Sequence, residues 1–435
     1  NKICGLDPVV DYDSDGDIDV VLGGPNSIYF LRNTPVNLVD NTTPVNGEIN
    51  VQQDAPFRAE FDDDMNANSI NTSNVTVQGS FSGKFSGALS ASTNSFSFNP
   101  AKDFSLGEQV SVVMNNKVLT QNGDTLLGGY SWKFTAQSVG GKGIFVLDSN
   151  YSSGGTKPVA VVAGYFNNDN YLDLIVANQS SNTLALLIYD SVSNKFSAGG
   201  TINTGTRPQG IAAADFDNDN VLDIAVANSG SNTVSIYENS GTGTFTLRAT
   251  VPVATISGTD PFALTAGDFD NDGFVDLVTS LYLSTNLRVL HNDGNFAFSA
   301  GDSTSVSSLP ISIATDDFNN DGCIDLAVAN LLSNRVSVVS NLKRGNFTQS
   351  GIISTGSRPS SVATGDMNND GYVDVLVAAS NENKIYIHKN FNGGTFSGAD
   401  SVTVIVSLNT SPRFIFTADV NGDGMTDIIT ANSSA

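Results

Sequence analysis

Short apolar segments recur along the chain, and each is bounded by acidic or polar turns. In one example, an apolar stretch at 211–214 precedes an Asp-rich loop, and an unbroken apolar run follows at 224–227. An alternating segment at 233–237 and a further segment at 245–251 complete the unit. Unbroken short runs are typical of strands buried on both faces, and alternation is typical of half-buried strands. The pattern predicts four short strands per unit and no helices.

The unit repeats with a nearly constant period. A nine-residue acidic loop starts at positions 11, 165, 215, 268, 317, 366 and 419, and from 165 onward the starts are 49 to 53 residues apart. Four short strands in about 50 residues are typical of a β-propeller blade. We therefore predict an all-β protein with a seven-bladed β-propeller.

The first interval between loops is about 100 residues longer than the others, which is the size of one inserted domain. We predict a first part of blade 1 at 1–33, an insert at 34–138 and the rest of the propeller at 139–435. Blade 7 would then hold only its first two strands, so we expect the natural polypeptide to continue beyond residue 435.

The insert has alternating short segments separated by Gly and Asn turns, which predicts a β-sandwich. Trp132 and Phe134 alternate with polar residues, so we expect at least one of them in the sandwich core. The acidic run of Asp62, Asp63 and Asp64 is interpreted as a solvated surface, with a weak cation site as the alternative.

The nine-residue loop has the composition of a calcium site. Positions 1, 3, 5 and 9 are Asp or Asn with one exception, and position 6 is Gly or Asn, which tolerate a left-handed backbone. Calcium takes six to eight oxygen ligands, which alternate side chains and the carbonyl of position 7 can supply. We predict up to seven Ca²⁺ ions. The candidate ligands are Asp11, Asp13, Asp15, Asp17, Asp19, Asn167, Asp169, Tyr171, Asp173, Asp215, Asp217, Asp219, Val221, Asp223, Asp268, Asp270, Asp272, Phe274, Asp276, Asp317, Asn319, Asp321, Cys323, Asp325, Asp366, Asn368, Asp370, Tyr372, Asp374, Asp419, Asn421, Asp423, Met425 and Asp427.

The loop at 165–173 is the weakest candidate, because Tyr165 and Asn167 replace its first two carboxylates. We expect it to be empty or to be completed by water. An EF-hand is excluded for every loop, since the twelfth position holds Leu, Val or Thr in place of the Glu that closes an EF-hand site.

The loops, their period and the strand that follows each loop resemble FG-GAP and VCBS-type repeats, the blades that also build integrin α-subunit propellers. Integrin-type FxxG or GAP signatures are not evident, so the bacterial branch is the closer likeness. The insert resembles a bacterial Ig-like domain of the surface-layer type. These resemblances imply a calcium-stabilised propeller that is secreted or displayed on the cell surface and used for adhesion or recognition.

Charge excludes one class of partner. Acidic residues number 44 against 20 basic ones, which gives a formal net charge of −24, so nucleic acid is a poor partner. Seven bound Ca²⁺ ions would reduce the net charge to about −10. No apolar run approaches the roughly 18 residues of a membrane span, so we expect no membrane insertion within this chain.

The ligand of such a module is expected to be a carbohydrate or an extracellular protein. If the insert projects from the end that carries the loops, the opposite end is free for recognition. Candidate contacts there are Lys157, Arg207, Arg358, Arg413 and Tyr282. The alternative is that the loops bearing these residues are purely structural.

Catalytic residues are scarce in the sequence. His291 and His388 are the only histidines, and no nucleophile motif, phosphate-binding loop or zinc spacing occurs. We therefore predict a non-enzymatic module. The alternatives are a calcium-dependent polysaccharide lyase or glycosidase on a propeller scaffold, and a structural spacer of a long surface protein.

Overall fold

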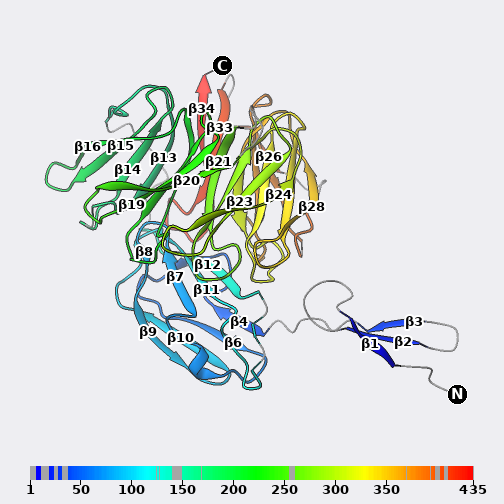
Figure 1. Ribbon diagram of the computed structural model, residues 1–435. Coiled ribbons are helices and arrows are strands. Elements are labelled where there is room, and N and C mark those ends of the chain that lie inside the picture. Colours follow the sequence, from blue (N-terminus) through cyan, green and yellow to red (C-terminus); the bar gives the residue numbers. More distant parts are fainter. Residues whose placement is uncertain are drawn as a thin grey trace.

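The chain folds almost entirely into β-strands (Figure 1). The computed structural model describes residues 6–10, 19–23, 28–31 and 38–434, without 124, 127, 140–148, 168, 254–259, 369, 392, 397–401 and 406–409. Within these residues the single helix is the 3₁₀ turn η1 (Ala67–Ser69). No helix there is long and apolar enough to cross a lipid bilayer. The all-β prediction is confirmed.

The first large unit is an Ig-like sandwich of two sheets. One sheet has the order β4 (Val39–Thr43), β6 (Phe57–Phe61), β10 (Ser95–Pro100), β9 (Gly87–Ala91). The other has the order β5 (Glu48–Val51), β12 (Tyr130–Ala136), β11 (Gln109–Met114), β7 (Val75–Gly79), β8 (Gly83–Lys84). Trp132 and Phe134 are both buried between the sheets, against Phe57. The sandwich and its core were both predicted correctly from alternation.

Five four-stranded antiparallel sheets follow, one per repeat, each in sequence order. Their strands are β13 (Pro158–Gly164), β14 (Asp173–Asn178), β15 (Thr183–Asp190) and β16 (Lys195–Asn203); β17 (Pro208–Ala214), β18 (Asp223–Asn228), β19 (Thr233–Asn239) and β20 (Phe245–Pro252); β21 (Pro261–Gly267), β22 (Asp276–Leu281), β23 (Asn286–Asn292) and β24 (Phe298–Ser305); β25 (Pro310–Asp316), β26 (Asp325–Asn330), β27 (Arg335–Asn341) and β28 (Phe347–Ser354); β29 (Pro359–Gly365), β30 (Asp374–Ala379), β31 (Lys384–His388) and β32 (Val402–Ile405). A two-stranded sheet of β33 (Thr410–Ala418) and β34 (Asp427–Ser434) comes last. These sheets are propeller blades.

Adjacent blades pack through their faces, with β13, β17, β21, β25, β29 and β33 as successive inner strands. The second residue of a loop fills the space between blades. Phe216, for example, is fully buried, and its ring meets the ring of Phe298 from the next blade edge to face at 5.5 Å. Phe269 meets Phe347 in the same way at 5.6 Å. Burying one such ring contributes about 2–3 kcal/mol, so the loop residues also bind neighbouring blades together.

The N-terminal strands β1 (Leu6–Val10), β2 (Asp19–Gly23) and β3 (Ile28–Leu31) form a three-stranded antiparallel sheet. Figure 1 shows this sheet at a distance from the other blades. The fourth strand expected for this repeat falls within 140–148, outside the described residues. Its place as the first of seven blades therefore stays a prediction.

Candidate metal centres

Each acidic loop joins the first and second strands of its blade, so its position is fixed by two paired strands. The loop at 215–223, for example, leaves β17 at Ala214 and enters β18 at Asp223. The ninth residue of every predicted loop is the first residue of the second strand, from Asp19 in β2 to Asp427 in β34. The loops from 165 onward therefore lie at one common end of the blades.

The first Asp of a loop is held by the loop's own backbone. Asp268 accepts hydrogen bonds from the amides of Asp272 at 3.0 Å and Gly273 at 2.8 Å, one on each carboxylate oxygen. Equivalent pairs of bonds occur at Asp215, Asp317, Asp366 and Asp419. At Asp268 and Asp317 each carboxylate oxygen accepts one such bond and keeps a free lone pair for a cation.

The third and fifth positions are oriented by shorter turns. Asp270 accepts the amide of Asp272 at 3.1 Å, and Asp272 accepts the amide of Phe274 at 2.8 Å. Such bonds to an amide two residues on are typical of Asx turns. They point successive carboxylates toward the inside of the same loop.

The ninth Asp links its loop to the third strand of the blade. Asp276 accepts the amide of Phe269 at 3.1 Å on one oxygen and the amide of Asn292 at 2.8 Å on the other. Equivalent pairs are formed by Asp223, Asp325 and Asp374. The ninth Asp is thus a structural residue as well as a candidate ligand.

The carboxylates come together most closely in two neighbouring loops. Ligand atoms of Asp215, Asp217 and Asp223 lie within 4.8 Å of one another, and so do those of Asp268, Asp270 and Asp272. Ligand atoms of Asp270, Asp276 and His291 also lie within 4.8 Å of one another. Clusters of carboxylate oxygens can hold a hard divalent cation.

Several loop carboxyl groups have raised pKa values, because burial disfavours the charged form and neighbouring carboxylates repel. The pKa of Asp223 is raised to about 8 by burial and then by Asp217 and Asp215. Burial and the charges of Asp317 and Asp321 likewise raise the pKa of Asp325 to about 8. A cation would relieve both causes, so the residues present fit a bound metal.

The predicted left-handed position is confirmed, and a second one was missed. The sixth residue has a φ of +66° at Asn170, +74° at Asn220 and +81° at Gly322. The fourth residue is also left-handed, at +64° in Asn218 and +56° in Asn271. The signal for it was present in the sequence, because Asn occupies the fourth position in five of the loops.

The weak loop is built differently from the others. Tyr165 holds its first position, so the loop has no first carboxylate to accept its amides. Asn167 donates its side-chain amide to Asp169 at 2.8 Å, as Asn368 does to Asp370 at 2.9 Å. Burial raises the pKa of Asp173 to about 6, with a contribution from Asp169. The loop that begins at Asp11 lies outside the described residues except for Asp19.

Sequence reasoning also missed an Asn at the end of the third strand, whose side chain binds the preceding blade. The side chain of Asn341 donates to the carbonyl of Phe269 at 2.7 Å and to that of Ile324 at 3.2 Å. Asn239, Asn292 and Asn390 make the same pair of bonds in their blades. Its signal is an Asn sixteen residues after the ninth Asp.

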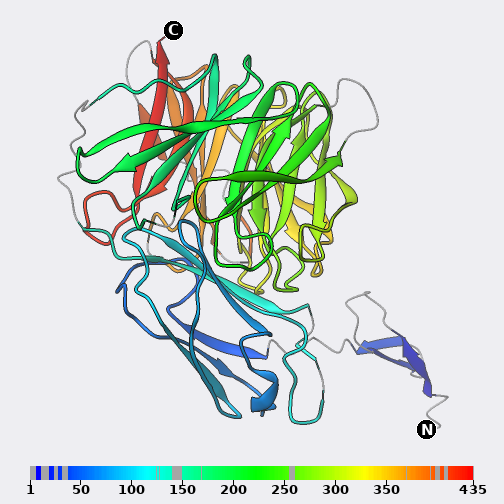
Figure 2. The ribbon, with the colours of Figure 1, turned by 60° about the vertical axis from the view of Figure 1, so that its left-hand side comes forward.

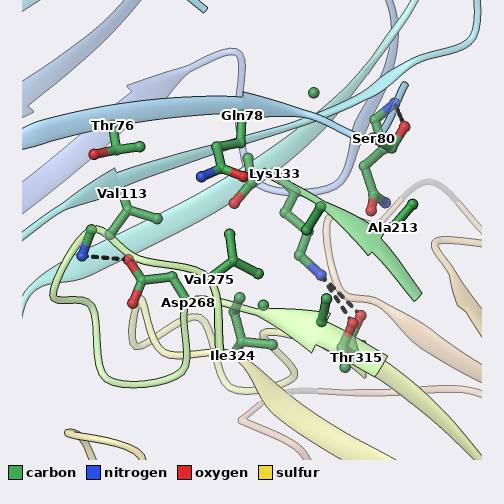
Figure 3. A pocket seen from close by; sticks show the side chains of 17 residues that line it. Thr76, Gln78, Ser80, Val113, Lys133, Ala213, Asp268, Val275, Thr315 and Ile324 are labelled. Atoms are coloured by element: carbon green, nitrogen blue, oxygen red, sulfur yellow. Dashed lines mark hydrogen bonds between the residues drawn. The ribbon is translucent and has the colours of Figure 1, made fainter. Parts of the chain in front are cut away.

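The Ig-like domain packs against the end of the propeller that carries the loops (Figure 2). Ser131 donates both its amide and its hydroxyl to the carbonyl of Gly322, at 2.7 and 2.9 Å. A cavity of about 150 Å³ lies between the domain and the inner strands (Figure 3). Lys133, which is 8% exposed, lines it and donates to the carbonyl of Thr315 at 3.0 Å.

The candidate recognition residues lie at the other end of the blades. Lys157, Arg207 and Arg358 directly precede inner strands, whereas Arg413 is near the start of β33 and Tyr282 follows β22. Lys157, Arg207, Arg358 and Arg413 are exposed, whereas Tyr282 is half-buried and stacks on Phe262 at 5.1 Å. The carbonyls of the first three residues each accept the amide of a turn after the second strand of the blade. These loops therefore have a structural role, and their charged side chains extend into solvent.

Comparison with known proteins agrees with this architecture. A model of the FG-GAP-like repeat matches residues 165–226, 222–279, 317–377 and 366–430, and a model of the bacterial Ig-like domain matches 32–136. No curated protein matches the sequence.

Three similar solved structures share low sequence identity with this chain. A proposed 6-phosphogluconolactonase from Bacteroides fragilis is 14% identical, with 83% of this chain and 99% of that one covered and a TM-score of 0.50. A proposed 6-phosphogluconolactonase from Bacteroides uniformis is 12% identical, with 98% of each chain covered and a TM-score of 0.47. A functionally unknown protein from Desulfotomaculum acetoxidans is 14% identical over 67% of this chain and 76% of that one, with a TM-score of 0.42.

At these identities the similarity concerns the fold alone. The repeat model, by contrast, matches more than half of the chain and coincides with the loops and strands described above. The chain belongs to the FG-GAP-like repeat family and carries a bacterial Ig-like domain.

Proposed function

We propose that this chain is a calcium-stabilised, non-catalytic binding module that is secreted or displayed on the cell surface. The proposal rests on the carboxylate groups that come together within each of two successive loops. Backbone amides of the loop already hold the first carboxylate in place. Bound Ca²⁺ would supply the positive charge that these oxygens lack. Up to seven ions would bind, through the side chains of positions 1, 3, 5 and 9 and the carbonyl of position 7.

Calcium binding is tested by calorimetric titration of metal-free protein together with thermal unfolding. A ligand that binds only the folded state raises its stability by mass action, so we expect the melting temperature to rise with free Ca²⁺. Mg²⁺ should stabilise less, because it prefers strict octahedral geometry and retains its waters. An unchanged melting temperature and no binding heat would refute the metal assignment.

Recognition is proposed for the end of the propeller opposite the Ig-like domain. The exposed Lys157, Arg207 and Arg358 would suit a carboxylate-bearing carbohydrate or an acidic surface of an extracellular protein. A binding screen of glycans and matrix proteins, run with calcium and with chelator, tests this. Loss of binding in a double Arg207→Ala, Arg358→Ala variant, with binding retained in Arg344→Ala, would support this surface. If the screen finds no ligand, the result would favour the alternative that the chain is a structural spacer of a long surface protein.

Catalysis is tested separately. Two assays are relevant. Hydrolysis of 6-phosphogluconolactone is tested because proposed 6-phosphogluconolactonases share the fold, and cleavage of acidic polysaccharides is tested because a lyase or glycosidase is the alternative function. We expect no turnover in either assay. Turnover that is abolished by a substitution in the propeller would overturn the non-catalytic assignment.

The N-terminal sheet is proposed as a further blade of the ring. Two inner strands border an open side of the described ring, and both expose apolar side chains there. Val161 on β13 is 59% exposed, and Phe414 and Phe416 on β33 are 57% and 53% exposed. The sheet of β1, β2 and β3 carries the same loop pattern as the other blades, so it is the natural cover for these side chains.

A further inference from the structure

The loop at 165–173 directs its first residue toward the Ig-like domain. In five other loops the first residue is an Asp that accepts the loop's own amides. Here Tyr165 donates its hydroxyl to Ser105 Oγ at 2.8 Å and its backbone amide to the carbonyl of Phe81 at 3.0 Å. The position that starts a candidate metal site elsewhere therefore serves as an interdomain contact.

A cation of the Ig-like domain faces the same loop. The ammonium of Lys102 donates to Asn170 Oδ1 at 2.8 Å and lies 5.7 Å from the centroid of the Tyr165 ring. Lys102 is exposed, so this pair adds modest energy, but it places positive charge beside the loop with the fewest carboxylates. The contact requires no metal.

The Ig-like side of this contact is rigid because of a buried carboxylate. Glu108 is fully buried and accepts the amides of Phe81 at 3.0 Å, Ser82 at 2.8 Å and Ser105 at 2.9 Å. Phe81 and Ser105 are the two residues that bind Tyr165. Glu108 thus holds the partners of Tyr165 in place before the domains meet.

The next three loops contact the Ig-like domain through residues of the loop itself, so these contacts require the loop to keep its folded conformation. The amide of Lys84 donates to Asp215 Oδ2 at 3.3 Å, on a carboxylate that is itself a candidate ligand. The carbonyl of Gly322, at a sixth loop position, accepts Ser131, and Asn271 donates to the carbonyl of Gly128 at 3.0 Å. Without a cation, the repelling carboxylates would loosen these loops and their contacts.

We infer that the Ig-like domain is held by two attachments of different kinds. The loop at 165–173 is a metal-free anchor, and the loops at 215–223, 268–276 and 317–325 form a latch that is ordered by calcium. This inference rests on the calcium binding proposed above. Removing calcium would release the latch while the anchor keeps the domain attached, so the domain would pivot and open the cavity beside Lys133.

Amide hydrogen exchange at single-residue resolution tests the two attachments. Both reporters donate across the interface, Ser131 to Gly322 in the latch and Tyr165 to Phe81 in the anchor. We expect removal of calcium to speed exchange of the Ser131 amide at least tenfold and that of the Tyr165 amide less than twofold. The inference is wrong if both amides speed up together, or if Ser131 stays protected in protein shown by calorimetry to have lost its calcium.

The number of bound Ca²⁺ ions, measured by calorimetry, is compared between two variants with the same substitution at the fifth loop position. Asp321→Asn should remove one bound Ca²⁺, because this loop belongs to the latch, whereas Asp169→Asn should leave the number of bound ions unchanged. Loss of one ion in Asp169→Asn would overturn the anchor assignment. If the wild type binds no calcium at all, the proposed function fails instead, so the two failures are distinguishable.

Tyr165→Phe tests the anchor in the presence of calcium. This variant keeps the ring and loses the hydroxyl bond to Ser105, so it should speed exchange of the Tyr165-position amide and leave Ser131 protected. Asp317→Asn should produce the reverse pattern. Asp366→Asn is the control, since no hydrogen bond joins its loop to the Ig-like domain within the described residues. Identical patterns in Tyr165→Phe and Asp317→Asn would contradict separate attachments.

Discussion

At the scale of single residues, side chains of the repeat connect parts of the chain that lie far apart in sequence. The ninth Asp accepts amides from its own loop and from an Asn at the end of the third strand, and the side chain of that Asn reaches back to the preceding blade. For Asn341 the three links join residues 269, 324 and 325, all of them buried. Blades are therefore coupled through specific polar contacts as well as through apolar packing.

Substituting the clasping Asn should weaken the boundary between blades. Asn341→Ala removes two hydrogen bonds. The buried carbonyl of Ile324 loses its side-chain partner, whereas that of Phe269 keeps the amide of Gly345, so we expect a loss of about 1–3 kcal/mol in the free energy of unfolding. Chemical denaturation measures this loss. Asn346→Ala, at an exposed turn, should change stability by less than about 0.5 kcal/mol. Equal effects of the two substitutions would contradict the clasp.

The raised pKa values predict how the metal-free protein responds to pH. The pKa values of Asp223, Asp317 and Asp325 are raised to about 8, chiefly by burial. Between the unfolded value near 4 and this folded value, the folded state binds more protons than the unfolded state, so stability falls as pH rises. We expect the melting temperature of metal-free protein to fall by on the order of 5 °C or more from pH 5 to pH 8.

Saturating calcium should remove this pH dependence, because the ion occupies the place of the bound protons. Thermal unfolding across the same pH range, with and without calcium, provides the comparison. A melting temperature of metal-free protein that rises with pH would show that the carboxylates are charged and stable without a metal.

At the scale of elements, one loop pattern serves different neighbours. The sixth position is a left-handed Gly in both the loop at 317–325 and the loop at 366–374, with φ of +81° at Gly322 and +85° at Gly371. A Cβ added at Gly322 would lie 2.2 Å from the ring of Tyr130 in the Ig-like domain, whereas one added at Gly371 would meet nothing within 4 Å. Both loops require a left-handed backbone at this position, but only the loop at 317–325 has a neighbouring side chain close to it.

This difference gives a paired test of docking. Gly371→Ala should cost about 1 kcal/mol from backbone strain alone. Gly322→Ala should cost more, and only this variant should speed exchange of the Ser131 amide, because it displaces Tyr130. Thermal unfolding and hydrogen exchange measure the two effects. Equal behaviour of the variants would mean that the Ig-like domain does not rest on this loop in solution.

At the scale of the whole molecule, the Ig-like domain packs on the end of the propeller that carries the loops, and the opposite end is the proposed recognition surface. The inner strands β13 and β33 border an open side, where Val161 and Phe414 are exposed. If the N-terminal sheet covers it, Val161→Asp should lower the free energy of unfolding by about 2 kcal/mol or more, since a charge would be buried. Val192→Asp, in a turn where the residue is 93% exposed, is the control and should have little effect. No loss in Val161→Asp would refute coverage by a further blade.

The sequence by itself determined the properties that depend on local spacing. Apolar periodicity gave four strands per repeat and the sandwich core around Trp132, and the loop pattern located the candidate ligands and the left-handed sixth residue. Each of these depends on residues within a few positions of one another, where backbone geometry allows few alternatives. Even the weak loop was recognisable, because Tyr165 interrupts the pattern.

Only the tertiary structure decided which surfaces meet. The clasp from Asn341 to Phe269 and the contacts of Tyr165 with Phe81 and Ser105 join positions that are 60 or more residues apart. The charge and size of a side chain do not specify which distant group it meets, because that follows from how the blades and the sandwich pack. For the same reason the sequence marked Tyr165 as a missing ligand, and the fold reveals what that side chain does.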